Sequence, residues 1–330
     1  MYHLIEMRRP RWAPAALGPE SAVVIKSAED IPQECRAEFR RSCGKHGTPI
    51  LAFFSSAIAR SMIDCAPRVV LLFGDVMHVI TPSNETRGTT TLEVLRSRLL
   101  GYGIAEFMLD DWFTVYYGVQ ASTVAMIPFA GCAAGLYGQL GRSLWAWLER
   151  GNGESHARRS VLSFGLPAQL PLRFTEFLQS HPEIRLGPDS VFQSGLAVSR
   201  SHRPFWPSLL LAISGSRLVV ISDQYDDYPS ASGVEATCLS LHAVNRVAWI
   251  DRSILRHARI AIDVEQQGRS LQFSWPASPQ FESTALNWIE WANSILMQAR
   301  LYTNSIPEPS PTAMQKTTNH GSSNSEWRYS

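Results

Sequence analysis

The chain lacks the residue patterns on which most catalytic and metal sites depend. Its five cysteines form no C-x-x-C pair, so the spacing of a zinc site is absent. The sequence also contains no H-E-x-x-H, no G-x-S-x-G, no Walker loop and no G-x-G-x-x-G. Because no catalytic motif is found, we predict a non-enzymatic protein with no metal and no cofactor.

An excess of charge of one sign is also missing. The 330 residues include 30 basic and 29 acidic ones, which leaves a net charge of +1, and charged residues make up only 18% of the chain. A near-neutral chain has no global field that attracts nucleic acid, so we expect no nucleic-acid partner. The length and the hydrophobic fraction of 45% suit two globular domains of ordinary size.

Signals for secretion or membrane insertion are weak. Residues 1–12 are polar and basic with no apolar core, which argues against a secretory signal. Residues 112–141 carry no formal charge and are long enough to cross a bilayer, but 113–117 has the β-branched and aromatic residues of a strand. We predict a cytoplasmic protein with reduced thiols and leave peripheral association with a membrane open.

One pattern of landmarks occurs twice, about 140 residues apart. In each copy a proline opens a short helix that contains a phenylalanine, a second proline precedes a hairpin, and a glycine lies in the hairpin turn. The paired landmarks are Pro32 and Pro171, Phe39 and Phe177, Pro67 and Pro207, and Gly74 and Gly215. We infer an internal duplication.

The second copy is expected to consist of seven strands and a closing helix. Alternation of apolar and other residues, interrupted by polar turns, is the main signal for these strands. The expected strands are 190–199, 208–213, 217–222, 237–241, 247–251, 259–264 and 270–275. In the helix that follows, Ser278 is the expected N-cap, and apolar residues at spacings of three and four continue to Leu296.

The first copy shows the same order with weaker signals. Its expected strands are 50–58, 69–73, 76–81, 92–95, 103–109, 112–117 and 123–128, and a helix with an apolar face is expected from Leu136 to Leu148. The chain then divides into an N-terminal arm at 1–29, a first repeat at 30–150, a linker at 151–167, a second repeat at 168–302 and a disordered tail at 303–330.

An order of about seven strands and one amphipathic helix resembles the PH-like superfold. The hairpin at 211–222 is similar to that of bacterial PH-like and GRAM-like domains, with an apolar run, a small polar turn, the basic residue Arg217 and a second apolar run. The resemblance implies a mainly β chain of two tandem, partly open barrels, each capped by its helix. The first copy departs from the pattern, because Val76 takes the place of the basic residue. A pair of plain β-sandwiches is the alternative.

The loop between the first two strands of the second copy is the candidate binding site. In PH-like domains that bind anionic headgroups, basic residues commonly gather in this loop, and here it contains Arg200, His202 and Arg203. Phe205 and Trp206 follow, as candidate anchors for a partner surface or a membrane interface. The alternative is a solvated loop whose aromatic residues fold over the end of the barrel.

Other polar positions are expected to be structural. The acidic loop that begins at Asp223 lacks the spacing of an EF-hand and is expected to be solvated. The pair at 110–111 is expected in a turn between strands, and His78 is expected to be a satisfied core histidine. The loop at 59–64, which matches the candidate binding loop, has one base and one acid, so a site is expected in the second copy alone.

Three functions follow from these features. We favour a binding or scaffolding protein that recognises a protein, a peptide or an anionic lipid headgroup, because tandem modules raise the effective concentration of a second contact. The alternative is an enzyme whose active site is assembled at the interface of the two repeats, for which a deep polar pocket would be evidence. A self-assembling component with exposed Trp and Tyr residues is the third.

Overall fold

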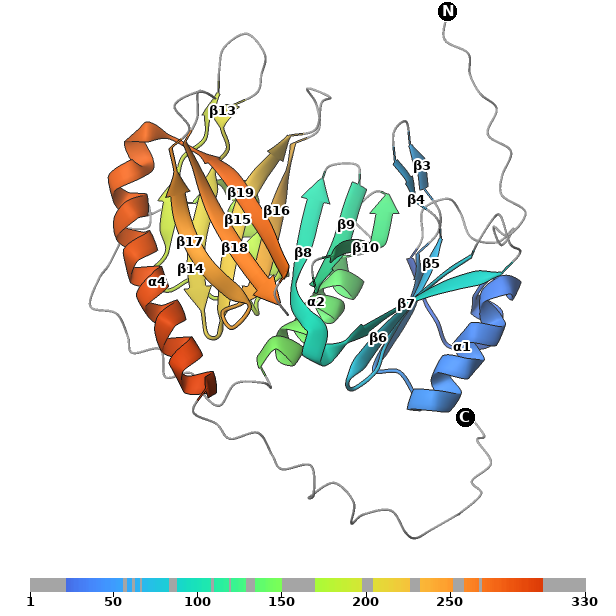
Figure 1. Ribbon diagram of the computed structural model, residues 1–330. Helices are drawn as coiled ribbons and strands as arrows, with labels where there is room; N and C mark the ends of the chain where they lie inside the picture. The colour runs from blue at the N-terminus through green and yellow to red at the C-terminus, as the bar shows by residue number, and fades with distance from the viewer. Residues whose placement is uncertain are drawn as a thin grey trace, which may run out of the picture.

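The computed structural model describes most of the chain (Figure 1). The described residues are 22–55, 58–60, 63–65, 67–82, 88–107, 110–118, 120–128, 134–149, 170–197, 204–225, 232–251, 258–266 and 269–304. They are mainly β, with three larger antiparallel sheets, two separate hairpins and a few helices, the last of which closes the described part of the chain. No helix in the described part of the chain is long and apolar enough to cross a membrane.

The first sheet has five strands in the order β1-β2-β5-β6-β7, and helix α1 (Gln33–His46) packs on one face of it (Figure 1). The helix begins after Pro32 and ends at Gly47, whose φ of 81° is a conformation that favours glycine. A separate hairpin of β3 (Ile58–Arg60) and β4 (Ile63–Cys65) lies between β2 and β5 in the chain. The sheet strands are Ala22–Val24, Leu51–Ser55, Arg68–Leu72, Val76–Pro82 and Thr89–Leu95.

Three further strands and a helix complete the first half. The meander comprises β8 (Leu99–Phe107), β9 (Asp110–Tyr117) and β10 (Gln120–Pro128), and α2 (Ala134–Glu149) follows. The apolar stripe of α2 is buried, with Leu140 and Leu144 fully enclosed. The expected strand at 112–117 and the expected helix are therefore confirmed, whereas residues 110–111 begin β9 instead of forming a turn.

The second half has a similar order of elements, with no described counterpart of β1. Helix α3 (Leu172–Ser180) precedes the strands, a hairpin separates the first strand of its sheet from the next, and α4 (Glu282–Asn304) closes it. The strands β14 to β16 and β17 to β19 form two successive meanders. The strands β11 to β19 are Val191–Gln193, Leu196–Ala197, Pro204–Trp206, Leu209–Ser214, Arg217–Tyr225, Ser232–Ser240, Val244–Ile250, Ala258–Gln266 and Arg269–Ala277.

The two halves share one sheet. Strand β8 pairs with β16 from Gly101↔Leu239 to Phe107↔Gly233, which joins the meanders into a seven-stranded sheet in the order β10-β9-β8-β16-β15-β14-β11. One face of this sheet packs against α2, α3 and the five-stranded sheet. The opposite face packs against the three-stranded sheet β17-β18-β19 and α4. The halves are therefore joined by backbone hydrogen bonds and by a common core.

Two strand predictions need correction. The expected strand at 190–199 is interrupted, because Gly195 turns toward the next segment and its N–H donates to Ser208 Oγ at 3.0 Å. The strands β15 and β16 are longer than predicted and take in polar residues that were expected in a loop, such as Asp223. Pairing with neighbouring strands on both sides outweighs the low strand propensity of these residues. The N-cap at Ser278 is confirmed, since its Oγ accepts from Gln280 N at 3.2 Å.

Candidate functional site

The predicted binding loop is described only at its end. Arg200, His202 and Arg203 lie outside the described residues, and the side chain of Phe205 is not described either. Residues 204–206 form β13, which pairs antiparallel with β12 and projects from the same edge of the molecule as the β3–β4 hairpin (Figure 1). Anion binding by the basic residues of the loop therefore stays a prediction.

A groove of about 400 Å³ lies next to this hairpin, between the seven-stranded sheet and β19. Pro207, which directly follows β13, contributes to its rim. The floor is formed by the seven-stranded sheet and the wall by aromatic residues of β19. We call this cavity the β19 groove.

The floor of the β19 groove is polar because two strands, β15 and β16, place hydroxyl or carboxylate side chains there. Along β15, Leu218 and Val220 face the core between the sheets, and Ser222 continues that face to its end. Ser222 is 1% exposed, and its Oγ has no hydrogen-bond partner among the described residues. Glu235 and Thr237 lie beside it on β16. A ligand that hydrogen-bonds Ser222 would supply the missing partner.

The wall of the groove is a chain of aromatic rings. Tyr116 meets Phe273 edge to face at a centroid distance of 4.9 Å, and Phe273 is stacked with Trp275 at 6.2 Å. Burial, followed by the Glu235 carboxylate, raises the pKa of Tyr116 above its usual value, so the hydroxyl stays protonated. The groove thus combines a polar floor with aromatic faces.

The absence of a side chain at Gly103 leaves room for the hydroxyl end of the Tyr116 ring. A Cβ atom at position 103 would come within 2.5 Å of the Tyr116 hydroxyl oxygen. Gly103 therefore has a packing role at the candidate site. Glycine inside a strand is the signal for such a close approach.

Asp223 contradicts the prediction of a solvated acidic loop. It is 4% exposed, forms an ion pair with Arg173 of α3 and accepts a hydrogen bond from Ser208 N at 3.0 Å. Because side chains alternate along β15, Asp223 points to the face opposite that of Ser222. Arg173 therefore offsets the charge of Asp223 from the far side of the sheet.

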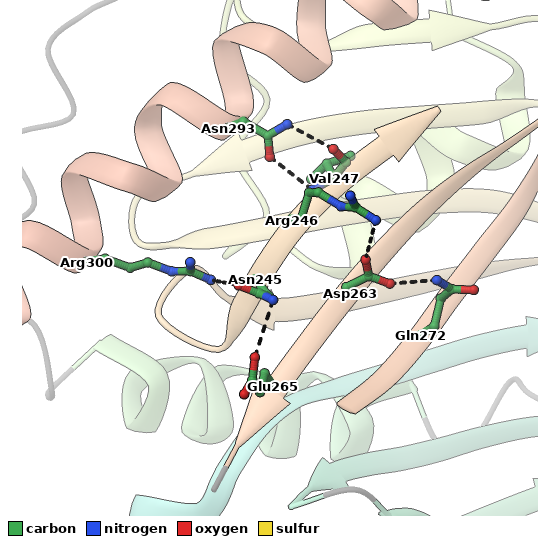
Figure 2. Close-up of polar contacts among 8 residues, drawn as sticks. All are labelled: Asn245, Arg246, Val247, Asp263, Glu265, Gln272, Asn293 and Arg300. Carbon is green, nitrogen blue, oxygen red and sulfur yellow. Dashed lines mark hydrogen bonds and ion pairs between the residues drawn. The ribbon is translucent and has the colours of Figure 1, made fainter. Parts of the chain in front are cut away.

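The outer edge of β17 is covered by the last helix. Asn293 of α4 accepts from Val247 N at 3.0 Å and donates to Val247 O at 2.9 Å, as Figure 2 shows. Arg300 donates to Asn245 Oδ1 at 2.6 Å and extends the contact between α4 and β17 (Figure 2). A partner strand that paired with β17 would have to displace these side chains.

The outer edge of β19 is also protected. Pro276 has no N–H group to offer, and its carbonyl oxygen accepts from Gln193 Nε2 at 3.4 Å. The next carbonyl on the same edge, that of Ser274, accepts from the Arg259 guanidinium at 3.0 Å. Side chains occupy backbone groups on both edges of the three-stranded sheet, which disfavours the addition of a partner strand at either edge. A peptide ligand would therefore contact the groove through the side chains of the peptide.

A second cavity, of about 540 Å³, lies between the two halves. Its lining includes Asp75 and Arg96 from the first half and His242 and Glu265 from the second, above an apolar floor that includes Trp147. Burial lowers the pKa of His242, which favours the neutral imidazole. We call this cavity the junction pocket.

His181 joins the halves through two carboxylates. Its Nε2 lies 3.0 Å from Glu106 Oε1 on β8, and its Nδ1 lies 3.4 Å from Glu183 Oε1. Burial alone would lower the pKa of His181, but the hydrogen bonds to both glutamates outweigh it and raise the pKa to about 9. The fully buried ring is therefore an imidazolium, and each of its two N–H groups donates a hydrogen bond to a glutamate.

Arg217, the basic residue of the hairpin at 211–222, is buried. Its guanidinium carbon lies 3.7 Å from the centre of the Trp145 ring, and the group donates to Trp145 O at 3.2 Å and pairs with Glu149. Arg217 therefore links β15 to α2. His78 is buried as expected, and its Nδ1 lies 2.8 Å from Ser42 Oγ. It is only partly satisfied, because its Nε2 has no hydrogen-bond partner and lies 3.4 Å from Glu93 Oε2.

No protein-family model and no curated protein matches the chain. Among the described residues, no group of three His, Cys, Asp or Glu side chains is arranged to hold a metal ion. The lining of the β19 groove presents hydroxyl groups, the Glu235 carboxylate and aromatic rings.

Proposed function

We propose that the protein is a binding module of two tandem PH-like halves that recognises a segment of a partner protein in the β19 groove. The observation that carries the proposal is the combination, in one groove beside the β12–β13 hairpin, of a buried hydroxyl without a partner and a wall of three aromatic rings. Aromatic side chains and desolvated polar groups are typical of the centres of protein interfaces.

The order of elements supports two tandem PH-like halves. Each half has a helix, a first strand, an inserted hairpin, the rest of a four-stranded meander, a three-stranded meander and a second helix. A meander of four strands and a meander of three, followed by one helix, is the order expected of a PH-like barrel. The shared sheet between β8 and β16 would make the pair one rigid unit.

The polarity of the groove favours a protein ligand over an anionic lipid headgroup. None of the described residues that line it is Lys, Arg or His, whereas Glu235 is acidic. A phosphate group would meet the Glu235 carboxylate there at an energetic cost. Trp206, a candidate anchor from the sequence, is half-buried on β13 and directly precedes Pro207 of the groove rim.

The proposal is tested by selecting twelve-residue peptides from a random phage-displayed library on the full chain. Selected peptides are synthesised and titrated calorimetrically against the wild type and Ser222→Leu, in which the larger side chain fills the floor of the groove. We expect Ser222→Leu to weaken binding at least tenfold. Because Ser222 is buried and the leucine adds volume there, a thermal melt of the variant checks that it is folded.

Ser294→Leu on the exposed face of α4 is the matched control and should bind like the wild type. Sedimentation with vesicles that contain anionic lipid is the second arm. Binding to vesicles without binding to any peptide would contradict the proposal, and so would peptide binding that Ser222→Leu leaves unchanged.

The junction pocket supports the enzyme alternative as a second candidate. It lies between the halves, where an assembled active site was expected, and it brings His242 near an arginine and two carboxylates. Enzymatic turnover that His242→Gln abolishes, with peptide binding unaffected, would favour this candidate over the first.

A further inference from the structure

We propose that the junction pocket binds a free α-amino acid with an apolar side chain. This inference goes beyond the proposed function, because it concerns the cavity of about 540 Å³ between the two halves and not the β19 groove. A cavity of this size is typical of sites for small molecules. Different segments of the chain give its lining a cationic side, an anionic side and an apolar floor, and an apolar amino acid has a group to match each of them.

The cationic side of the junction pocket is Arg96, which directly follows β7 and is half-buried. Its backbone N–H donates to Asp75 O at 2.8 Å, which holds the two residues next to each other. Within the described part of the chain, the Arg96 guanidinium has no ion pair and no hydrogen bond. A guanidinium presents a planar fork of N–H donors that matches both oxygens of a carboxylate. The carboxylate of an amino acid would therefore supply the partner that Arg96 lacks.

The anionic side consists of Asp75, in the turn between β5 and β6, and Glu265, at the end of β18. Glu265 Oε2 accepts from Asn245 Nδ2 at 3.3 Å, and Arg300 in turn holds Asn245, as Figure 2 shows. Neither carboxylate forms an ion pair with a base among the residues that the structure describes. An ammonium group has three N–H donors and no acceptor, so the free carboxylate oxygens of this side suit it.

Charges of both signs in one cavity favour a ligand that also carries both. A simple anion that paired with Arg96 would be repelled by Asp75 and Glu265, and a simple cation that paired with the carboxylates would be repelled by Arg96. A zwitterion matches both sides at once, and its two charged groups are held on one carbon atom in an α-amino acid.

The floor of the junction pocket determines the kind of side chain. It is formed by buried apolar residues of β8 and α2, among them Leu100, Trp147 and Leu148. An apolar side chain of the ligand that packs on this floor is removed from water together with it, which stabilises the complex. The amino acid expected in the pocket is therefore one of the size and polarity of leucine.

The experiment uses four small probes at pH 7. L-leucine is a zwitterion, N-acetyl-L-leucine keeps the carboxylate alone, L-leucinamide keeps the ammonium group alone, and glycine is a zwitterion without an apolar side chain. Each probe is titrated into the isotopically labelled full chain, and the amide resonances of Leu100, Ala243 and Glu265 are followed. We expect a dissociation constant on the order of 0.1 mM for leucine and at least tenfold weaker binding of each of the other three probes.

Arg96→Gln should weaken binding of leucine at least tenfold and remove its advantage over leucinamide, because the group that selects the carboxylate is gone. Arg98→Gln is the matched control. Arg98 is exposed, lies two positions further along the chain and does not line the pocket, so this variant should bind leucine like the wild type.

Equal binding of leucine and leucinamide by the wild type overturns the inference, and so does the absence of any shift with leucine; neither result depends on a variant that folds. A loss of leucine binding in Arg98→Gln as large as that in Arg96→Gln also overturns it. The peptides of the proposed function bind in a different cavity, so a failure of peptide binding counts against that function alone, and a failure of leucine binding counts against this inference alone.

Discussion

The imidazolium of His181 predicts how stability changes with pH. Its side chain is 0% exposed and lies between Glu106 and Glu183 on segments from both halves. The pKa of about 9 in the folded chain lies above the value of 6.5 for an ordinary histidine, so the folded state binds a proton that the unfolded state releases first. The resulting stability is fully present below pH 6.5 and is lost as the pH rises through 9.

The difference in pKa corresponds to about 3 kcal/mol of unfolding free energy, at 1.36 kcal/mol for each unit. Urea unfolding of the full chain, followed by tryptophan fluorescence between pH 6 and 10, measures it. The matched variant is His181→Gln, which cannot titrate. The stability gap between the wild type and this variant should shrink by about 3 kcal/mol between pH 6.5 and 9.5. A gap that stays constant over this range would refute the assigned charge of His181.

Three further predictions concern the groove and the sheets around it. Ser222→Ala should leave the unfolding free energy unchanged or raise it by about 1 kcal/mol, because Ser222 Oγ has no partner. Ser208→Ala should lower the unfolding free energy by about 1 kcal/mol, because Ser208 Oγ accepts a hydrogen bond from Gly195 N. Gly103→Ala should lower the unfolding free energy by about 1–3 kcal/mol, because the added Cβ clashes with Tyr116. Gly74→Ala adds its Cβ in open space and should be nearly neutral, and thermal melts of the two variants make the comparison. Asn293→Ala should cost about 1–2 kcal/mol and speed amide exchange at Val247, since it uncovers the β17 edge; unchanged exchange there would count against the capping role.

Local patterns were enough to predict most of the elements. The hairpin turn at Gly215, where φ is 61°, and the N-cap at Ser278 follow from short-range chemistry and are confirmed. The helices that begin after Pro32 and Pro171 are confirmed for the same reason. Turn residues and caps act within a few positions, so a single sequence carries their signal.

The candidate site depends on contacts that are distant in the chain and was not predictable in this way. Tyr116 of the first half and Phe273 of the second lie in one wall only because β8 pairs with β16. Asp223 and Arg217, taken from the sequence as a solvated acid and a basic residue of a hairpin, are buried by partners that lie 50 or more positions away. Tertiary pairing outweighed local polarity at each of these positions.

The claim that the β19 groove is the binding site is tested most directly by hydrogen–deuterium exchange of the full chain with and without a selected peptide. Protection on binding should be concentrated at residues 222–225 of β15, 232–237 of β16 and 270–276 of β19, which line or adjoin the groove. Protection that instead centres on residues 95–100 and 240–243, around the junction pocket, would contradict the account.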